Sequence, residues 1–204
     1  MVTTKKQLVE EFRCRAIRDA AMRVVGRKGL EKATVDDIAR EAGVAKGTVY
    51  LYFKSRDEVI EKTIGAAVDE LLARLRSAAE GAGPGPFADA LERVLTAQFA
   101  YFDENRAFFR LYFASGEYSE ERRLRQSRRY RIHLDQLVAL IKRGRRRGEL
   151  NGLDPERTAI AIAGAARDLI LRRLNEREPP PAAADARFLR DLLFSGLVVR
   201  GESA

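Results

Sequence analysis

The chain has 204 residues, of which 46% are hydrophobic and 33% charged, and this balance excludes an intrinsically disordered protein. Its formal net charge of +8 points to a polyanionic partner such as nucleic acid, an anionic membrane surface or a phosphorylated ligand. One cysteine, Cys14, rules out an intramolecular disulfide and a thiolate metal cluster.

The first predicted element is a helix over residues 7–28, ended by Gly29. Its apolar residues recur at steps of three and four and are expected to form one buried face: Val9, Phe12, Ala16, Ala20 and Val24. Thr34 opens a second helix, because its side chain can cap the N–H three residues on. A third helix is expected from about Lys46 to Phe53, after a turn of three residues at 43–45.

The rest of the chain shows further helical patterns and no alternation typical of strands. Glycine and proline separate the patterns, above all at 81–86 and 179–181. The expected helices cover residues 55–79, 87–104, 106–115, 118–147, 155–177 and 185–200. The sequence therefore predicts an all-α protein of about nine helices.

Residues 38–50 have the spacing of a DNA-reading helix-turn-helix. Ala39 is small enough for two helices to cross closely, Gly43 supplies the positive φ of a tight turn, and Val49 faces back into the core. The third helix then exposes polar and basic side chains, as a helix in the major groove requires. The predicted DNA-binding residues are Thr34, Lys46, Gly47, Thr48, Tyr50, Tyr52, Lys54 and Arg56.

The charge of this region supports the same interpretation over a plain helical hairpin. Residues 1–55 hold twelve Lys or Arg against seven Asp or Glu. Two tyrosines and a threonine on the exposed side of a short basic helix have no packing reason to be there. Lys46 suits a phosphate or a guanine edge, and the tyrosine hydroxyls suit phosphates.

The segment Thr34–Phe53, followed by Lys54–Val59, resembles the DNA-binding domain of the TetR family of bacterial transcriptional regulators. The resemblance is dense over some 50 residues. Seven residues stand where family members contact DNA: Thr34, Lys46, Gly47, Thr48, Tyr50, Tyr52 and Arg56. The resemblance implies a DNA-binding domain at 1–55, a connecting helix at 55–79, and a ligand-binding and dimerisation domain at 80–204.

The resemblance also implies a homodimer built from the last two helices. Small or apolar residues on the first of them form a candidate contact surface: Ala159, Ile160, Ile162, Ala163, Gly164 and Ala166. The last helix carries an apolar stripe that a core helix would show equally well: Phe188, Leu189, Leu192, Leu193, Leu197 and Val198.

The middle helices hold nine of the sixteen aromatic residues, and the family's ligand pocket lies in this part of the chain. Core packing explains most of them individually, whereas the cluster favours a cavity for an apolar effector. The pocket residues we predict are Phe99, Phe102, Phe109, Tyr112 and Phe113.

Residues 122–147 hold eleven Arg or Lys and one acidic residue, Asp135. A basic face exposed to solvent is the commonest explanation of such a stretch. Two further interpretations are a binding site for a phosphorylated ligand such as an acyl-CoA and a positive electrostatic field that attracts DNA.

The sequence thus predicts a ligand-responsive repressor that acts as a homodimer on a palindromic operator, with a small-molecule effector and no cofactor. A nucleoid-occlusion factor on the same scaffold is the alternative. A single histidine, His133, gives no nucleophile–base pair, so we expect no enzyme, no catalytic residue and no metal site. A peripheral membrane protein that uses residues 122–147 is a further alternative. Residues 1–6 lack the apolar segment of a signal peptide and no stretch is long enough to span a membrane, which favours the cytoplasm.

Overall fold

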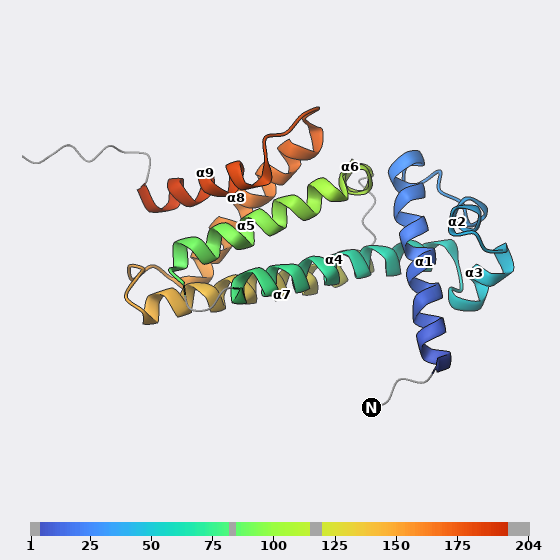
Figure 1. Ribbon diagram of the computed structural model, residues 1–204, viewed down its shortest axis with the longest axis horizontal. Coiled ribbons are helices and arrows are strands. Elements are labelled where there is room, and N and C mark those ends of the chain that lie inside the picture. The colour runs from blue at the N-terminus through green and yellow to red at the C-terminus, as the bar shows by residue number, and fades with distance from the viewer. Residues whose placement is uncertain (1–4, 82–84, 115–119, 196–204) are drawn as a thin grey trace, which may run out of the picture. The chain divides into compact units, whose positions relative to one another are not determined.

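The computed structural model describes residues 5–81, 85–114 and 120–195. Within these ranges the chain forms nine α-helices and no strand, which confirms the predicted all-α fold (Figure 1). The helices are α1 Lys5–Lys28, α2 Val35–Ala42, α3 Lys46–Tyr52, α4 Arg56–Glu80, α5 Phe87–Glu104, α6 Arg106–Ala114, α7 Glu120–Arg146, α8 Pro155–Asn175 and α9 Ala182–Ser195.

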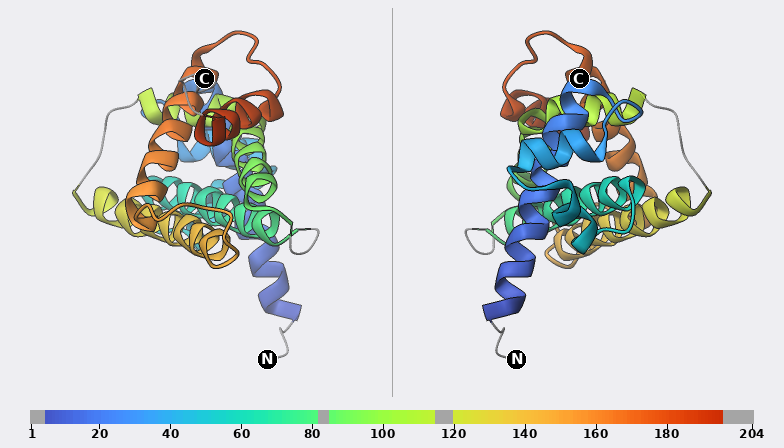
Figure 2. Two further views of the ribbon diagram at one scale, coloured as in Figure 1. Left: turned by 90° about the vertical axis from the view of Figure 1, so that its left-hand side faces the viewer. Right: turned by 90° about the vertical axis from the view of Figure 1, so that its right-hand side faces the viewer.

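The chain divides into two compact units, and the first consists of Met1–Asp69 with Asn105–Glu117. In this unit α1 packs against α2 and α3 on one side and against α6 on another (Figure 2). A Cβ on Gly26 would lie 3.1 Å from the Cβ of Ala107, so this glycine lets α1 and α6 approach closely. The core of the unit includes Ile17, Ala20, Ala21, Val24, Val25, Ile38, Val49, Phe53, Val59 and Ile60.

One expectation for α1 is wrong. Val9 and Phe12 were predicted to lie on its buried face, but they are 49% and 73% exposed. The buried positions of α1 begin at Ile17, where α2 and α6 pack on it. The first turns of α1 therefore have an apolar side, as the periodicity predicts, but no other described residue covers that side.

The second unit consists of Glu70–Glu104 with Tyr118–Ala204. Within it α5 packs against α7, α8 and α9, and α7 also packs against α8. Leucines and isoleucines of α7 and α8 supply much of the core, because both helices repeat apolar residues at steps of three and four: Leu134, Leu137, Leu140, Ile141, Ile162, Ile170 and Leu174.

A buried arginine of the second unit forms ion pairs that connect three of its helices. Arg173 of α8 is only 1% exposed, and its guanidinium binds Asp103 of α5 and, at 2.5 Å, Asp185 in the first turn of α9. Arg172 reaches Asp185 as well, at 3.0 Å. A guanidinium presents several donors in a fixed plane, so one side chain can satisfy two carboxylates from different elements.

Within the described ranges no helix combines the length and the apolar content needed to cross a bilayer. The same ranges contain no group of three His, Cys, Asp or Glu side chains suited to hold a metal ion.

Candidate nucleic-acid interface

The turn between α2 and α3 is built by local interactions that the sequence encodes. Thr34 caps α2: its Oγ1 accepts a hydrogen bond from the backbone N–H of Asp37 at 3.1 Å and donates one to the Asp37 carboxylate at 2.8 Å. Gly43 ends α2 in the left-handed conformation, with φ at 67°, as predicted. Its N–H and that of Val44 bond back to carbonyls of the last turn, so α3 starts in a fixed direction.

The inner sides of α2 and α3 are apolar. Ile38 and Ala39 of α2 and Val49 of α3 are at most 3% exposed, and Phe53 follows α3 with 5%. Val49 and Phe53 therefore anchor the short third helix to the core of the first unit. This burial explains why seven residues, too few to be stable alone, keep one orientation.

Ion pairs fix α2 to α1 on the outside of the unit. Arg23 and Arg27 of α1 bind Glu41 near the end of α2, and Lys28 binds Asp37 at 2.6 Å. The hydrogen bonds that Asp37 accepts from Lys28 and Thr34 lower the pKa of its carboxyl to about 2. Both carboxylates are thus charged at neutral pH and hold the helix pair together.

The outer side of α3 brings together most of the predicted DNA-binding residues. Lys46, Gly47 and Tyr50 are exposed, and Thr48 and Tyr52 are half-buried at its flanks. These five residues form what we call the α3 face. A helix with polar and basic side chains on the side opposite its anchor has the geometry that the major groove admits.

Lys46 has a partner in this structure. Its ammonium lies 2.9 Å from the Asp36 carboxylate, in the first turn of α2. The hydrogen bond to Asp36 raises the pKa of Lys46, so the lysine stays protonated. Both groups are more than half exposed and remain open to exchange with a phosphate.

The three remaining predicted residues surround the α3 face in different ways. Lys54 is exposed, while its backbone N–H binds the Glu58 carboxylate at 2.6 Å. Arg56 turns inward, because its guanidinium donates to the backbone carbonyl oxygens of Leu30 and, at 2.6 Å, of Ala33. It also pairs with Asp57, so it supports the loop before α2. Thr34 is exposed, with its hydroxyl engaged in the cap described above.

Leu51 is a further exposed residue of α3, outside the predicted set. This leucine is 79% exposed and follows Gly47 by four residues on α3, so the two share one side of the helix. The sequence feature that could have indicated this exposure is its position between Tyr50 and Tyr52, both of which were predicted to lie on the outer side. An exposed leucine in this position suits apolar contact with the methyl group of thymine.

The predicted aromatic pocket residues fall into both units. Phe99 and Phe102 are buried in α5 of the second unit, whereas Phe109, Tyr112 and Phe113 belong to α6 of the first. The rings of α6 pack on one another. The ring centroid of Phe113 lies 6.1 Å from that of Phe109 and 5.4 Å from that of Tyr112. None of the five lines the two cavities of the second unit that are described next.

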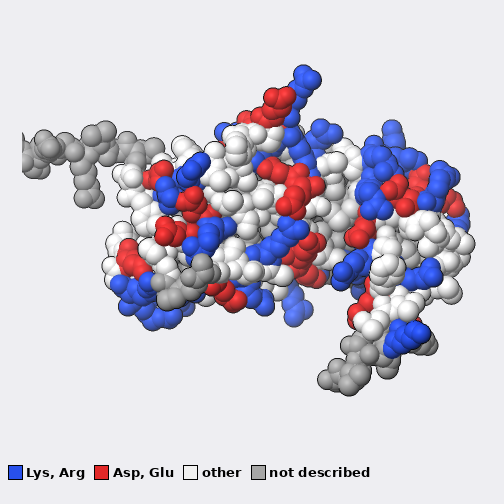
Figure 3. All heavy atoms as spheres, in the orientation of Figure 1, with Lys and Arg blue, Asp and Glu red and all other residues white. Residues whose placement is uncertain are grey.

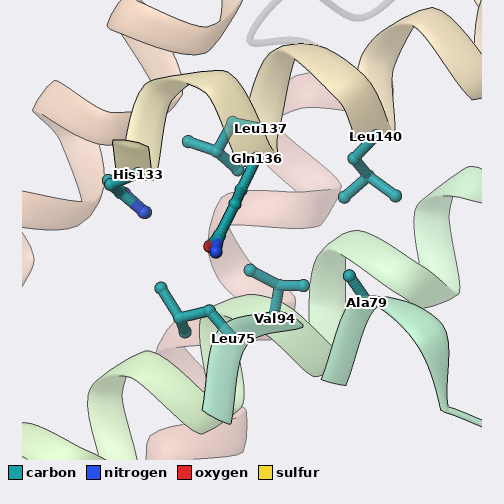
Figure 4. Close-up of a pocket in the computed structure, with 7 residues that line it drawn as sticks. All are labelled: Leu75, Ala79, Val94, His133, Gln136, Leu137 and Leu140. Atoms are coloured by element: carbon teal, nitrogen blue, oxygen red, sulfur yellow. The ribbon is translucent and has the colours of Figure 1, made fainter. Parts of the chain in front are cut away.

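One of these cavities lies in the second unit, among α4, α5 and α7 (Figure 4). Its volume is about 10 Å³, roughly the room that one water molecule needs. We call it the His133–Gln136 cavity after its two polar lining residues. The others are apolar: Leu75, Ala79, Val94, Leu137 and Leu140. Burial lowers the pKa of His133 to about 4, so its imidazole is neutral at neutral pH.

The other cavity lies at the C-terminal end of α7, where Lys and Arg gather in Figure 3. Part of this basic stretch has intramolecular partners. Arg143 donates to the carbonyl of Ala79, and Arg147 donates to that of Gly85 and pairs with Glu149. Further back on α7, Arg131 binds Glu156. Within the described part of 122–147, several cations therefore hold the fold together.

Comparison with known proteins assigns the chain to a family. The family model described as "Bacterial regulatory proteins, tetR family" matches residues 17–63, which include α2 and α3. An HTH-type transcriptional regulator of Bacillus subtilis, YfiR, is 30% identical over 140 residues, 68% of each chain. The chain belongs to the TetR family. Its α2–α3 pair is therefore the helix-turn-helix of a DNA-binding transcriptional regulator, as the sequence predicts.

Two further proteins are similar to this chain over most of its length. The regulator BetI of Rhizobium meliloti is 29% identical over 199 residues, which is 95% of this chain and 94% of BetI. The fold also matches a crystal structure of Bacillus subtilis FadR in complex with stearoyl-CoA, with a TM-score of 0.78 and 23% identity. That match covers 90% of this chain and 99% of FadR and shows a shared fold.

Proposed function

We propose that this TetR-family regulator is a repressor that binds a palindromic operator as a homodimer and responds to a small-molecule effector. The observation that carries the proposal is the α3 face, with Lys46, Thr48 and Tyr50 exposed or half-exposed opposite the buried Val49. In this arrangement α3 enters the major groove, and residues 1–55 form the DNA-binding domain. Residues 80–204 form the domain for the effector and the dimer, with residues 55–79 connecting the two.

Each side chain of the α3 face has a role in this proposal. Lys46 leaves Asp36 for a phosphate or a guanine edge, and the hydroxyls of Tyr50 and Tyr52 bind phosphates. Gly47 allows close approach of the backbone, since nothing lies within 4 Å of the position of its missing Cβ. Thr48 contacts a phosphate or a thymine methyl, and Leu51 adds an apolar base contact.

Lys54, Thr34 and Arg56 stand at the edge of the proposed interface. Lys54 reaches a phosphate with its free ammonium end. Thr34 and Arg56 contact the DNA backbone only by exchanging the partners they hold here, which are Asp37 for the threonine and two carbonyl oxygens for the arginine. We therefore assign most of the affinity to α3.

Exposed apolar side chains on α8 and α9 support the homodimer. Ile160 of α8 is 49% exposed, and Phe188, Leu193 and Phe194 of α9 are 44–58% exposed. Large apolar side chains exposed on the last two helices are candidates for burial against a second copy. Two copies of one short helix also read two half-sites of a palindrome, which raises both affinity and specificity.

The expected dimer surface needs one correction. Within α8 the residues Ala159, Ile162, Ala163 and Ala166 are buried in their own unit, at 0–5% exposure. Only Ile160 and the half-buried Gly164 of that set are accessible to a partner. In α9, Leu189 is also buried, while Leu197 and Val198 lie outside the described residues. Phe188, Leu192 and Leu193 remain accessible.

The effector response has a physical route through α4. This helix follows α3 almost directly, and its later residues Leu75 and Ala79 line the His133–Gln136 cavity. An effector that favours one position of α4 changes the population of DNA-binding and non-binding states. That Bacillus subtilis FadR, which shares the fold, was solved with stearoyl-CoA is consistent with effector control.

Selection of bound sequences from a random DNA pool tests the proposal. We expect one palindromic sequence to emerge, with an affinity that falls steeply with salt. Lys46→Ala should make the slope of log K, the association constant for DNA, against log salt concentration shallower by about 1, the value expected for one lost phosphate contact. Tyr50→Ala should weaken binding. Lys142→Ala and Tyr130→Ala are matched controls, because both residues are equally exposed but lie on α7.

The outcome that refutes the interface is plain. If the Lys46 and Tyr50 variants bind the selected operator as tightly as the parent, α3 does not read the DNA. Sedimentation tests the dimer separately: Phe188→Asp should give monomers, and Arg187→Asp, an exposed neighbour, is the control for the added charge.

A further inference from the structure

Two polar atoms in the second unit are buried without a hydrogen-bond partner. They are Nε2 of His133 and Oε1 of Gln136, and no other side-chain nitrogen or oxygen in the described chain is in this position. Both belong to α7 and both line the same cavity. Buried polar groups in native proteins are almost always satisfied, so a pair facing one cavity indicates a group that binds there.

The orientation of the glutamine amide is fixed by its other end. Nε2 of Gln136 donates to the backbone carbonyl of Leu72 on α4, at 3.3 Å. If the amide were flipped, Oε1 of Gln136 would face the carbonyl oxygen of Leu72, and two acceptors would meet. Oε1 therefore points into the cavity. Figure 4 shows both polar ends, from His133 and Gln136, directed toward the space between α7 and the α4 and α5 side chains.

The two groups lie on neighbouring positions of α7 and line one cavity. His133 and Gln136 are three residues apart on one helix, and such pairs are neighbours on the helix surface. A hydroxyl donates its proton to Oε1 of Gln136 and accepts a hydrogen bond from Nε2–H of His133. A water molecule offers the same donor and acceptor, and the cavity of about 10 Å³ has room for one.

The lining excludes charged ligand groups. No carboxylate, lysine or arginine lines the cavity, and the imidazole is neutral. A carboxylate placed here would be buried without a cation and would meet the Gln136 oxygen, while an ammonium would be buried without an anion. The remaining side chains offer only apolar contact.

We propose that the His133–Gln136 cavity receives a neutral hydroxyl group of the effector, an alcohol or a phenol on an apolar body. The hydroxyl takes the place of a water molecule, and the body displaces Leu75, Leu137 and Leu140 as it enters. This assignment rests on the proposed effector response and names the chemistry of the site. It requires the histidine proton to lie on Nε2 in the bound state.

The lone histidine makes the test direct. His133 is the only histidine of the chain, so ¹⁵N NMR of the labelled full-length protein gives one imidazole without ambiguity. The probes are phenol, toluene and benzoate, which share a ring and differ in the polar group. When phenol binds, the imidazole should carry its proton on Nε2, and the ¹⁵N resonance of Nε2 should shift. Phenol should also bind about tenfold more tightly than toluene. Benzoate should not bind at this site.

Variants check that the hydroxyl is bound where we place it. Gln136→Met removes the acceptor at similar size and should abolish the preference for phenol over toluene. Gln98→Met, a buried glutamine of α5 that does not line the cavity, should retain it. Because the comparison of the three probes on the parent protein needs no variant, a misfolded variant leaves the test intact.

The outcomes separate this inference from the proposed function. If phenol leaves the Nε2 resonance unchanged up to its solubility limit, or if benzoate binds as tightly, the hydroxyl site is refuted, even when the protein binds its operator. If phenol binds as expected but no operator emerges from the selection, the proposed function fails and the cavity keeps its chemistry.

Discussion

The ammonium of Lys46, in the first turn of α3, lies 2.9 Å from the carboxylate of Asp36, in the first turn of α2. Both side chains are more than half exposed, so the pair adds little to stability. Its effect is on position, because it holds the cation at the turn between the two helices. A phosphate that binds Lys46 must compete with this carboxylate.

Asp36→Asn should therefore tighten operator binding. Removing the competing charge is expected to raise the affinity about threefold, the size of one exposed ion pair, with a loss of stability below about 1 kcal/mol. Fluorescence anisotropy at several salt concentrations measures it. Asp135→Asn is the matched control, since Asp135 is equally exposed and also pairs with a cation, Arg131. A lower affinity of the Asp36 variant would show that the carboxylate positions Lys46 for binding.

Leu51 should read thymine. Replacing a contacted thymine by deoxyuridine removes one methyl group and is expected to weaken binding of the parent about fourfold, at ~0.8 kcal/mol for a buried carbon group. The Leu51→Ala variant should not distinguish the two operators. The control is Leu153→Ala, an exposed leucine of the second unit. Equal discrimination by parent and Leu51 variant would remove this leucine from the base contacts.

Two glycines four residues apart should respond to alanine with opposite signs. Gly43 has φ at 67°, where an alanine is strained, so Gly43→Ala should lower the free energy of unfolding by about 1 kcal/mol. Gly47 lies in α3 with open space around it, so Gly47→Ala should raise it by roughly 0.5–1 kcal/mol. The Gly47 variant should nevertheless bind the operator more weakly. Urea unfolding and anisotropy measure both effects.

The buried His133 should make stability depend on pH between about 6.5 and 4. The unfolded chain takes up a proton below 6.5, whereas the folded chain does so only below about 4. Acidification across this window should therefore cost roughly 3 kcal/mol of the free energy of unfolding. The His133→Gln variant should lose this part of the slope. A histidine that titrates near 6.5 in the folded protein would show that the cavity is open to solvent.

Removal of the buried guanidinium should strongly destabilise the second unit. Arg173→Met leaves Asp103 and Asp185 without their main partner, with an expected cost of about 3 kcal/mol. The estimate is at the low end for a buried pair, because Arg172 still reaches Asp185. Arg131→Met, which breaks an exposed pair with Glu156, should change stability by less than about 1 kcal/mol. Thermal unfolding of both variants checks the difference.

Local sequence patterns are enough to place the helices, the turn at Gly43 and the residues of the α3 face. Those features depend on interactions between residues close in the chain: the cap at Thr34, the positive φ of a glycine, and apolar side chains at helical spacing. The family resemblance likewise rested on one continuous segment, and the match over residues 17–63 confirms it.

Which side of each helix is covered depends instead on the packing of helices that are distant in the sequence. A helical stripe looks the same whether a neighbour packs on it or not, so Phe12 was assigned to the core and is exposed, while Ala163 was assigned to a partner and is buried. The same holds for the charged Arg56, which was predicted to contact DNA. Its guanidinium instead donates hydrogen bonds to two backbone carbonyl oxygens that are distant in the sequence. The cavity that His133 and Gln136 of α7 line together with residues of α4 and α5, and the pairing of Lys46 with Asp36 beside the α3 face, likewise depend on how separate helices meet.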